Sequence, residues 1–282
     1  LNAGSNLRSL SQGADVVFVG TAALLDAVSP LAELRESQGF RVKMIDIESV
    51  YGEFGEGVRS GAALKDFLKY ATANWQAPSL KYVVLVGDGS YDPRNALGYA
   101  AQPGDLPIHL VKGKYLDYSS DNWFVAFNET DDLPALSIGR IPAGTHAIVT
   151  AYVNKALAYE SGQAKPQGVS ASSLTLVADE DQIGGENFTP LLQELAEAIP
   201  AWNTKLQVSQ VRRSELNDAQ ARQAILQAFD SGSAFVHYLG HGAEDRWSSM
   251  FLNADADGLA NTKLPVVVAM NCLNAYHYSA DP

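Results

Sequence analysis

The sequence predicts an α/β protein made of two consecutive subdomains, each with a mainly parallel sheet flanked by helices. Three observations lead to this prediction. Strand-like and helix-like segments alternate from one end of the chain to the other. Several strand-like runs, such as DVVFVG at 15–20, are apolar enough for strands covered on both faces. A polar segment rich in Gly, Ser and Pro, residues 161–172, interrupts the alternation. We therefore expect subdomains over 1–165 and 166–282.

In the first half, the buried strand at 15–20 is followed by helical apolar spacing that stops at Gly39, a common helix terminator. The stretch 89–133 is rich in Gly, Pro, Asp and aromatic residues and has no clear period. Thr145 is expected to cap the helix after the last strand of this half. The expected strands are 15–20, 40–47, 81–88 and 135–141, and the expected helices are 21–38, 60–75 and 145–160.

In the second half the alternation restarts after the linker. Ser214 is a residue type that favours helix starts, and we expect it to cap the second helix. The last two strands end abruptly at polar residues. The expected strands are 173–179, 204–211, 233–239 and 264–270, and the expected helices are 186–198 and 214–229.

The amino-acid composition and the net charge limit the classes of function that the protein can have. Apolar residues make up 46% of the 282 residues, enough for a substantial core. The formal net charge of −12 would repel phosphate backbones, so we expect no nucleic-acid partner. No apolar run reaches the roughly 18 residues of a membrane span. The chain starts at Leu1 without a basic and apolar leader, so we expect a mature product or an excised piece whose signal peptide is not in this chain.

Two strand ends carry residue types that can do chemistry. The run 233–239 leads into Gly240-His241-Gly242, and the run 264–270 leads into Asn271 and Cys272, the sole cysteine. Ligands of open α/β sheets bind outside the carboxyl ends of the strands. If the two strands are parallel neighbours, His241 and Cys272 emerge at one edge, about one or two strand spacings of ~4.8 Å apart.

Such a pair suits acyl transfer. A free thiol with a pKa near about 8.5 is only a few per cent ionised at neutral pH. A neighbouring His241 would raise that fraction or protonate a leaving amine. Gly242 lacks a side chain, so its N–H could serve a developing oxyanion together with the N–H of Cys272. The alternatives are an inert buried thiol, a tight turn carrying a surface histidine, or a His/His/Cys zinc site, which lacks a fourth ligand at the usual spacing.

The segments YLGHGAEDRW and VVVAMNCLNAYHY resemble the histidine and cysteine motifs of the gingipain-type cysteine peptidases, family C25, which are relatives of caspases and legumains. Upstream, YVVLVGDGSYDPRN, SSDNWF and LPALSIGRIPAGT follow in the order expected of that family's catalytic domain. The resemblance implies a caspase–hemoglobinase fold in two α/β subdomains. It also implies a secreted or cell-surface bacterial protein.

The resemblance assigns roles residue by residue. It makes Cys272 the nucleophile and His241 the catalytic histidine, with the N–H groups of Gly242 and Cys272 as the oxyanion hole. Glu244 matches an acidic residue that follows the histidine in gingipains, and we expect it to orient or charge His241. The implied reaction is hydrolysis of a peptide bond in a protein or peptide substrate, through a thioester acyl-enzyme and with no cofactor for catalysis.

The resemblance also places a substrate pocket. In gingipains an acid from the region of VADEDQIGGENF (177–188) holds the basic residue before the scissile bond. Asp179, Glu180 or Asp181 would then select Arg or Lys by charge pairing. The alternative for these acids is a solvated turn or a calcium site.

Gingipains bind calcium, so the loop carboxylates of Asp88, Asp92 and Asp121 are candidate ligands for structural calcium. Asp88 and Asp92 lie in GDGSYD, and such residues also form turns by bonding their own backbone.

The chain ends at Pro282, soon after Cys272, whereas gingipain-type domains continue with elements that wall the pocket. We expect the C-terminal part to be missing, or to be a partner fragment of the same precursor, which would leave the sheet edge beside 264–270 open. The alternative function is a catalytically idle caspase-like module used for binding or for processing a larger secreted protein.

Overall fold

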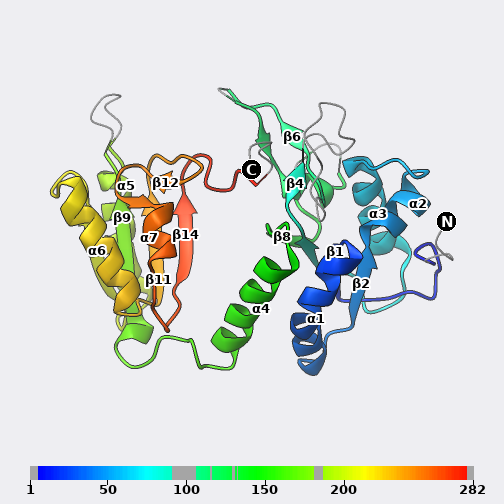
Figure 1. The fold of residues 1–282 in the computed structure, drawn as a ribbon, viewed down its shortest axis with the longest axis horizontal. Helices are drawn as coiled ribbons and strands as arrows, with labels where there is room; N and C mark the ends of the chain where they lie inside the picture. The colour runs from blue at the N-terminus through cyan, green and yellow to red at the C-terminus, as the bar shows by residue number, and fades with distance from the viewer. Residues whose placement is uncertain are drawn as a thin grey trace. The chain divides into compact units, whose positions relative to one another are not determined.

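The computed structural model describes residues 6–90, 106–114, 116–128, 131, 133–180 and 187–277. The chain forms two compact units (Figure 1). One unit comprises Leu1–Leu157 with Tyr276–Pro282, and the other comprises Ala158–Ala275. Each unit has a four-stranded parallel sheet with helices packed on it, which confirms the predicted α/β class.

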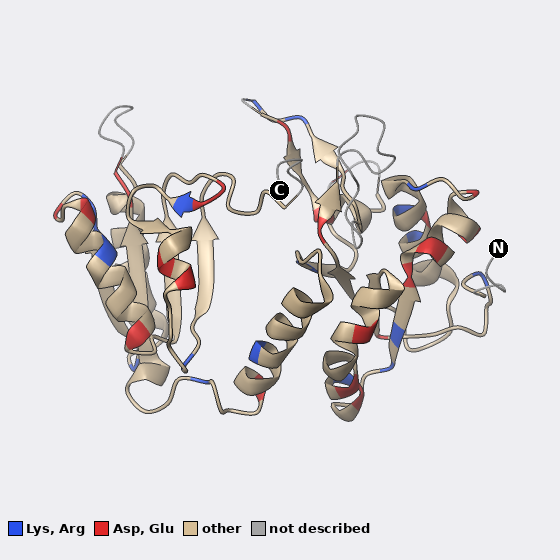
Figure 2. Cartoon of the chain, viewed as in Figure 1, with Lys and Arg blue, Asp and Glu red and all other residues tan. Residues whose placement is uncertain are grey.

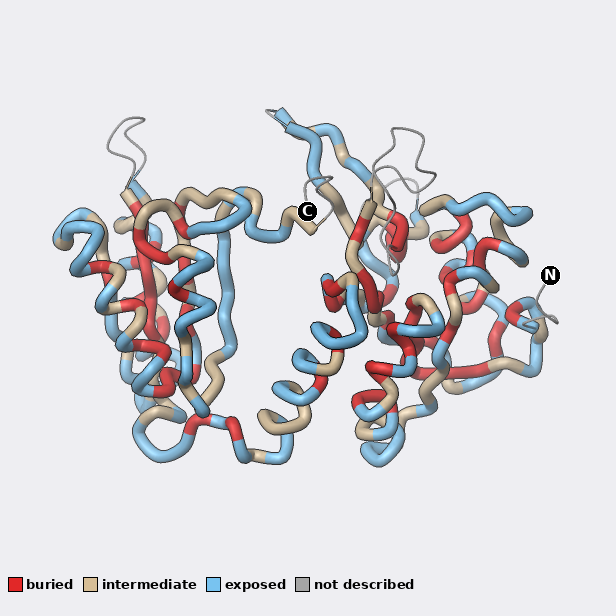
Figure 3. Tube along the Cα trace, in the orientation of Figure 1, coloured by how far each residue is buried: buried red, intermediate tan, exposed pale blue. Residues whose placement is uncertain are grey.

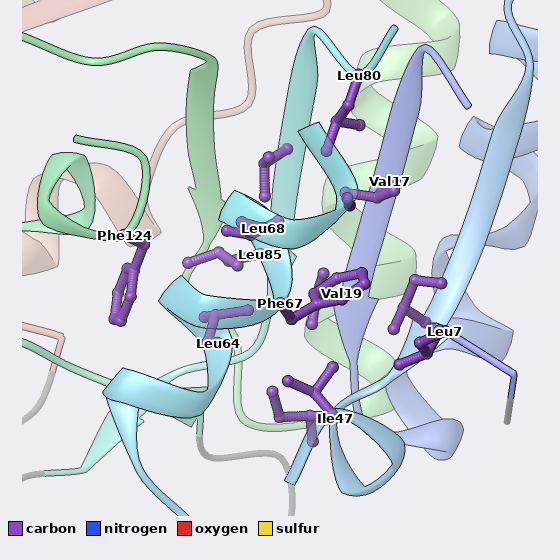
Figure 4. Close-up of a cluster of buried hydrophobic side chains, with 14 of the residues drawn as sticks. Leu7, Val17, Val19, Ile47, Leu64, Phe67, Leu68, Leu80, Leu85 and Phe124 are labelled. Atoms are coloured by element: carbon purple, nitrogen blue, oxygen red, sulfur yellow. The ribbon is translucent and has the colours of Figure 1, made fainter. Parts of the chain in front are cut away.

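The sheet of the first unit has the strand order β2-β1-β3-β8, and all its pairs are parallel. Along β1, successive side chains alternate between the two faces of the sheet. Val16 and Phe18 pack with α1 and α4, while Val17 and Val19 pack with α2 and α3. Figure 4 shows the second of these cores. The elements are β1 (Val16–Gly20), α1 (Ala22–Ser37), β2 (Val42–Asp46), α2 (Ile47–Phe54), α3 (Gly61–Asn74), β3 (Tyr82–Val86), β8 (Ser137–Ile141) and α4 (His146–Glu160).

Helix α2 is missing from the sequence-based prediction, which extended the second strand to residue 47. Asp46 ends β2 and caps α2, since its side chain accepts a hydrogen bond of 3.1 Å from the Glu48 N–H. Strand and helix therefore follow each other without a loop, and the apolar alternation of the strand ran on into the helix. The predicted cap at Thr145 is confirmed, because its Oγ1 accepts a bond of 3.4 Å from Ile148 N–H.

The stretch 89–133, for which the sequence showed no helical or strand periodicity, contains several short elements. Its residues 91–105 lie outside the described part of the chain. Arg140, on β8, holds this stretch to the sheet. Its side chain is 4% exposed and pairs with both oxygens of Asp121, at 2.7 and 2.9 Å. It also donates to the carbonyls of Gly87, Asp88 and Pro107 at 3.1–3.3 Å. The elements are β4 (Gly89–Ser90), β5 (Leu106–Pro107), β6 (Leu110–Val111), β7 (Tyr118–Ser119) and the 3₁₀ turn η1 (Asp121–Phe124).

The sheet of the second unit has the order β10-β9-β11-β14, again all parallel. Leu176 and Ala178 of β9 pack against α5, whereas Val177 packs with Val236 against α6. The elements are η2 (Ser170–Ser172), β9 (Ser173–Ala178), α5 (Thr189–Trp202), β10 (Gln207–Arg212), α6 (Asp218–Asp230), β11 (Phe235–Leu239), β12 (Arg246–Trp247), β13 (Phe251–Leu252), α7 (Asn253–Asp257) and β14 (Val266–Met270).

The predicted cap of α6 at Ser214 is wrong. The helix begins three positions later in a capping box, in which Asn217 accepts from Gln220 N–H at 3.0 Å and Gln220 accepts from Asn217 N–H at 3.1 Å. The Ser214 hydroxyl instead lies 3.2 Å from that of Thr189. A reciprocal box satisfies two backbone donors, so it outcompetes a single serine cap nearby.

Strand β14 is open to solvent although it is wholly apolar. Val266, Val267, Val268 and Met270 are 39–56% exposed, whereas Val236 on the neighbouring strand is 0% exposed. Figure 3 shows β14 as an exposed strand, and Figure 2 shows that it carries no charged residue. Since successive side chains point to opposite faces, the other elements of the same unit leave both faces of β14 partly open. Among those residues, no helix is long and apolar enough to cross a membrane.

Candidate active site

Three neighbouring strands of the second unit end at one edge of the sheet. Leu239 of β11 is paired with Ala178 on one side and with Met270 on the other. Beyond this register, Gly240 N–H donates to Met270 C=O at 3.2 Å, and Asp179 N–H donates to Leu239 C=O at 3.0 Å. The predicted parallel pairing of the two strands is therefore confirmed, and it brings the histidine and cysteine segments to a common edge.

The glycines on either side of His241 are required by close approaches. A Cβ on Gly240 would collide with the Cβ of Asp179 and lie 2.6 Å from the Tyr238 hydroxyl. A Cβ on Gly242 would collide with the Asn271 side chain and lie 2.5 Å from the Cys272 carbonyl oxygen. The backbone after β11 is thus packed between β9 on one side and the cysteine segment on the other.

Cys272 is an exposed thiol at the start of a tight turn. Leu273, next in the chain, has a φ of +62°, the left-handed conformation that non-glycine residues rarely adopt. Asn274 N–H then donates to the Cys272 carbonyl at 2.8 Å. Such backbone strain clusters at functional sites, where surrounding contacts hold it in place.

Asn274 ties this turn to the histidine segment, a role that the sequence did not reveal. Its side-chain amide donates to the carbonyls of Ala243, at 2.5 Å, and Arg246, at 3.2 Å. Its Oδ1 accepts from the Asn271 side chain. The available signal was the turn-forming asparagine pair itself, Asn271 and Asn274. Two loops far apart in sequence are therefore held as one unit around Cys272.

Asp179, one of the three acids predicted for the substrate pocket, is 0% exposed. Its Oδ1 accepts from Arg213 Nη1 at 3.0 Å and from Glu180 N–H at 2.8 Å. Glu180 is half-buried, so its carboxylate is the one of the described pair that reaches solvent. Asp181 lies outside the described residues. The pocket role stays a prediction for these acids.

Burial and charge act on the groups around Asp179. Burial raises the pKa of Tyr238, and the Asp179 carboxylate raises it further, while Arg213 lowers it in part. Burial disfavours the charged form of Arg213, but the carboxylates of Asp179 and Asp218 outweigh it and raise the pKa of Arg213. Tyr238 therefore stays protonated and Arg213 charged over the range in which enzymes work.

The imidazole of His241 packs edge-on against Phe188, with ring centroids 5.2 Å apart and an interplanar angle of 82°. His237, on β11 itself, is half-buried, and burial lowers its pKa. The described residues contain no group of three or more His, Cys, Asp or Glu side chains that could hold a metal ion.

Glu244 lies on the exposed surface three positions after His241, so its orienting role stays a prediction. It lines a pocket of about 230 Å³ between the histidine segment, β14 and the turn after Cys272. Its lining includes two carboxylates, Glu244 and Asp245, and two aromatic rings, Trp247 and Phe251. Its lining residues are Glu244, Asp245, Arg246, Trp247, Phe251, Leu252, Asn253, Ala269 and Asn274.

The predicted calcium ligands lie in the first unit. Asp121 is occupied by its ion pair with Arg140, and the Asp88 carboxylate accepts from Gly89 N–H at 3.0 Å, as a turn-forming aspartate does. Asp92 lies outside the described residues. Calcium at these positions stays a prediction.

Comparison with known proteins gives a consistent result. The family model described as peptidase family C25 matches residues 9–281. The crystal structure of the Arg-specific cysteine proteinase gingipain R is 18% identical, with a TM-score of 0.69 over 94% of this chain and 55% of that chain.

The complex of the pro- and mature domains of RgpB from Porphyromonas gingivalis is 17% identical, with a TM-score of 0.70 over 92% of this chain and 56% of that one. The chain thus spans about half the length of these solved structures and shares their fold. Among curated proteins, none matches the chain.

Proposed function

The chain belongs to peptidase family C25, and on that basis we propose that it is a cysteine endopeptidase whose nucleophile is Cys272 and whose general acid–base is His241. One observation carries the proposal. The backbone at Gly242 packs directly against Asn271 and Cys272, so that a Cβ on Gly242 would collide with the cysteine segment. A thiol, an imidazole and a side-chain-free N–H at one sheet edge supply the groups that acyl transfer needs.

The reaction follows from these groups. The Cys272 sulfur attacks the carbonyl carbon of the scissile peptide bond, and His241 takes the thiol proton. The N–H groups of Gly242 and Cys272 stabilise the oxyanion of the tetrahedral intermediate. His241 then gives the proton to the leaving amine, which leaves a thioester on Cys272. Water, deprotonated by His241, hydrolyses the thioester and frees the second product, so no cofactor takes part.

We further propose a preference for Arg or Lys before the scissile bond. Its support is two carboxylates that are not fully buried: Glu180, which follows β9, and Glu244, in the pocket that Ala269 and Asn274 also line. A cationic side chain would pair with either carboxylate, and the net charge of −12 favours its approach.

The exposure of strand β14 is evidence that another segment of the same precursor binds to it. An apolar parallel strand that exposes 39–56% of most of its side chains is normally covered on both faces. We propose that a C-terminal segment of the precursor pairs with β14 and covers it. Co-expression with that segment should protect the Val267 and Ala269 amides, which point away from β11, from hydrogen exchange, and unchanged exchange would contradict the pairing.

The experiment for the activity itself is active-site labelling read by intact mass. The probe is a peptidyl acyloxymethyl ketone with Arg at its reactive end, and the matched probe carries Glu there. The Cys272 thiolate displaces the probe's carboxylate to form a thioether. We expect one adduct per chain with the Arg probe, none with Cys272→Ala, and slow labelling with Gly242→Ala, whose Cβ would displace the cysteine segment.

The outcomes separate the two candidate functions. Faster labelling by the Arg probe than by the Glu probe supports the basic preference, and equal rates contradict it. If neither probe labels while iodoacetamide still alkylates Cys272, the thiol is exposed but unassisted. That result would reject the peptidase proposal for this chain in favour of an idle caspase-like binding module.

A further inference from the structure

A buried polar cluster lies directly behind His241 and bonds to its backbone. Asp179 Oδ2 accepts from His241 N–H at 3.2 Å. The Tyr238 hydroxyl donates to His241 C=O at 2.5 Å and lies 3.4 Å from Asp179 Oδ2. The peptide groups on both sides of the histidine Cα are therefore held by the side chains of Asp179, directly after β9, and Tyr238, on β11.

The carboxylate in this cluster is itself fixed. Asp179 is fully buried, and a buried charge persists only when it is paired and hydrogen-bonded. Arg213 supplies the pair and is anchored in turn by Asp218, at 3.0 Å, and by the Ser248 hydroxyl, at 2.9 Å. Both oxygens of Asp179 are thus committed to fixed donors, and the carboxylate cannot rotate away from His241.

Tyr238 is rigid for a different reason. It is 0% exposed, and its ring stacks on Trp247 with centroids 4.8 Å apart and an interplanar angle of 5°. The stack therefore holds the ring so that its hydroxyl lies against the His241 carbonyl. On the other side, the close approach of Gly242 to the cysteine segment stops the histidine backbone from moving away.

We propose that Asp179 and Tyr238 are positioning residues that set the place of the His241 imidazole relative to Cys272 by clamping both of its peptide groups. This inference rests on the proposed peptidase function. It gives Asp179 a role behind the histidine instead of in a substrate pocket. Because catalytic groups must be held tightly, a displacement of about 1 Å can cost about 10²-fold in rate.

The test uses Tyr238→Phe, which deletes only the hydroxyl and keeps the ring on Trp247. The control is Phe229→Leu, which weakens the same hydrophobic core but removes none of the hydrogen bonds to His241 and lies outside the pocket lining. For each variant, the labelling probe counts the competent sites, and kcat for a peptide substrate is divided by that count. A purely structural role lowers the number of competent sites and leaves the rate per site unchanged.

We expect Tyr238→Phe to lower kcat per site by about 10-fold with KM unchanged, and Asp179→Ala by about 10²-fold. Phe229→Leu should lower the unfolding midpoint but not the rate per site. A Tyr238→Phe rate per site equal to that of the wild type overturns the clamp. Absence of labelling in the wild type itself rejects the peptidase proposal instead, so the two failures are distinguishable.

Discussion

Replacing His241 with alanine is expected to lower kcat/KM for a peptide substrate by about 10³- to 10⁴-fold, the contribution typical of a positioned general acid–base. Cys272→Ala should remove the activity altogether, because no other thiol exists in the chain to form the thioester. The measurement is the initial rate of cleavage of a fluorogenic peptide with Arg before the scissile bond, with enzyme in excess for the slow variants.

Groups that act as one unit lose their effect together, so the double variant His241→Ala/Cys272→Ala should be no slower than Cys272→Ala alone. The matched control is His146→Ala. His146 lies on α4 of the other unit, is 55% exposed in its side chain, and contacts Asp26 at 3.5 Å. Its rate should equal that of the wild type. Full activity in His241→Ala would refute the dyad.

The largest effect on stability is expected for Arg140→Met. Arg140 is almost fully buried, and its guanidinium pairs with both carboxylate oxygens of Asp121, at 2.7 and 2.9 Å. Its removal leaves a partly buried carboxylate without its counter-charge, and three carbonyls lose a donor. Breaking one partner of a buried pair typically costs about 3–5 kcal/mol. The free energy of unfolding in urea, at pH 7, measures the loss.

Arg59→Met is the matched control for this prediction. Arg59 pairs with Glu48 at 2.9 Å in the same unit, but the two side chains are 53% and 49% exposed. Exposed pairs contribute about 0–1 kcal/mol, so this variant should be nearly as stable as the wild type. The double variant Arg140→Met/Asp121→Asn should recover part of the loss, since the unpaired charge is gone. Equal losses for Arg140→Met and Arg59→Met would contradict the role of burial.

Much of the fold could be predicted from local pattern. The eight strands of the two parallel sheets and helices α1, α3, α4, α5 and α6 all correspond to segments whose apolar spacing or β-branched content indicated them. Periodicity is a local property, because a residue's place on a strand or helix decides which face it presents. The thiol and the imidazole at the ends of two of these strands were visible for the same reason.

Competition between neighbouring signals could not be resolved locally. Ser214 and Asn217 are both good caps, and the reciprocal bonds with Gln220 decided in favour of Asn217. The apolar run through Ile47 indicated a strand, yet Asp46 caps a helix there. In each case the observed cap satisfies backbone N–H donors at the start of the helix. Whether a side chain can reach those donors depends on the folded geometry and not on residue type alone.

By itself, the sequence determined the fold class, the strand ends that carry His241 and Cys272, and the family to which they point. Only the tertiary structure decided what surrounds them: that Asp179 is buried behind His241, that Asn274 joins the two loops, that Arg140 holds Asp121, and that β14 lies open. The physical reason is that burial and pairing belong to contacts between residues far apart in the chain. The sequence around Asp179 does not show whether its carboxylate is neutralised by an arginine 34 positions away, as it is by Arg213, or is solvated by water.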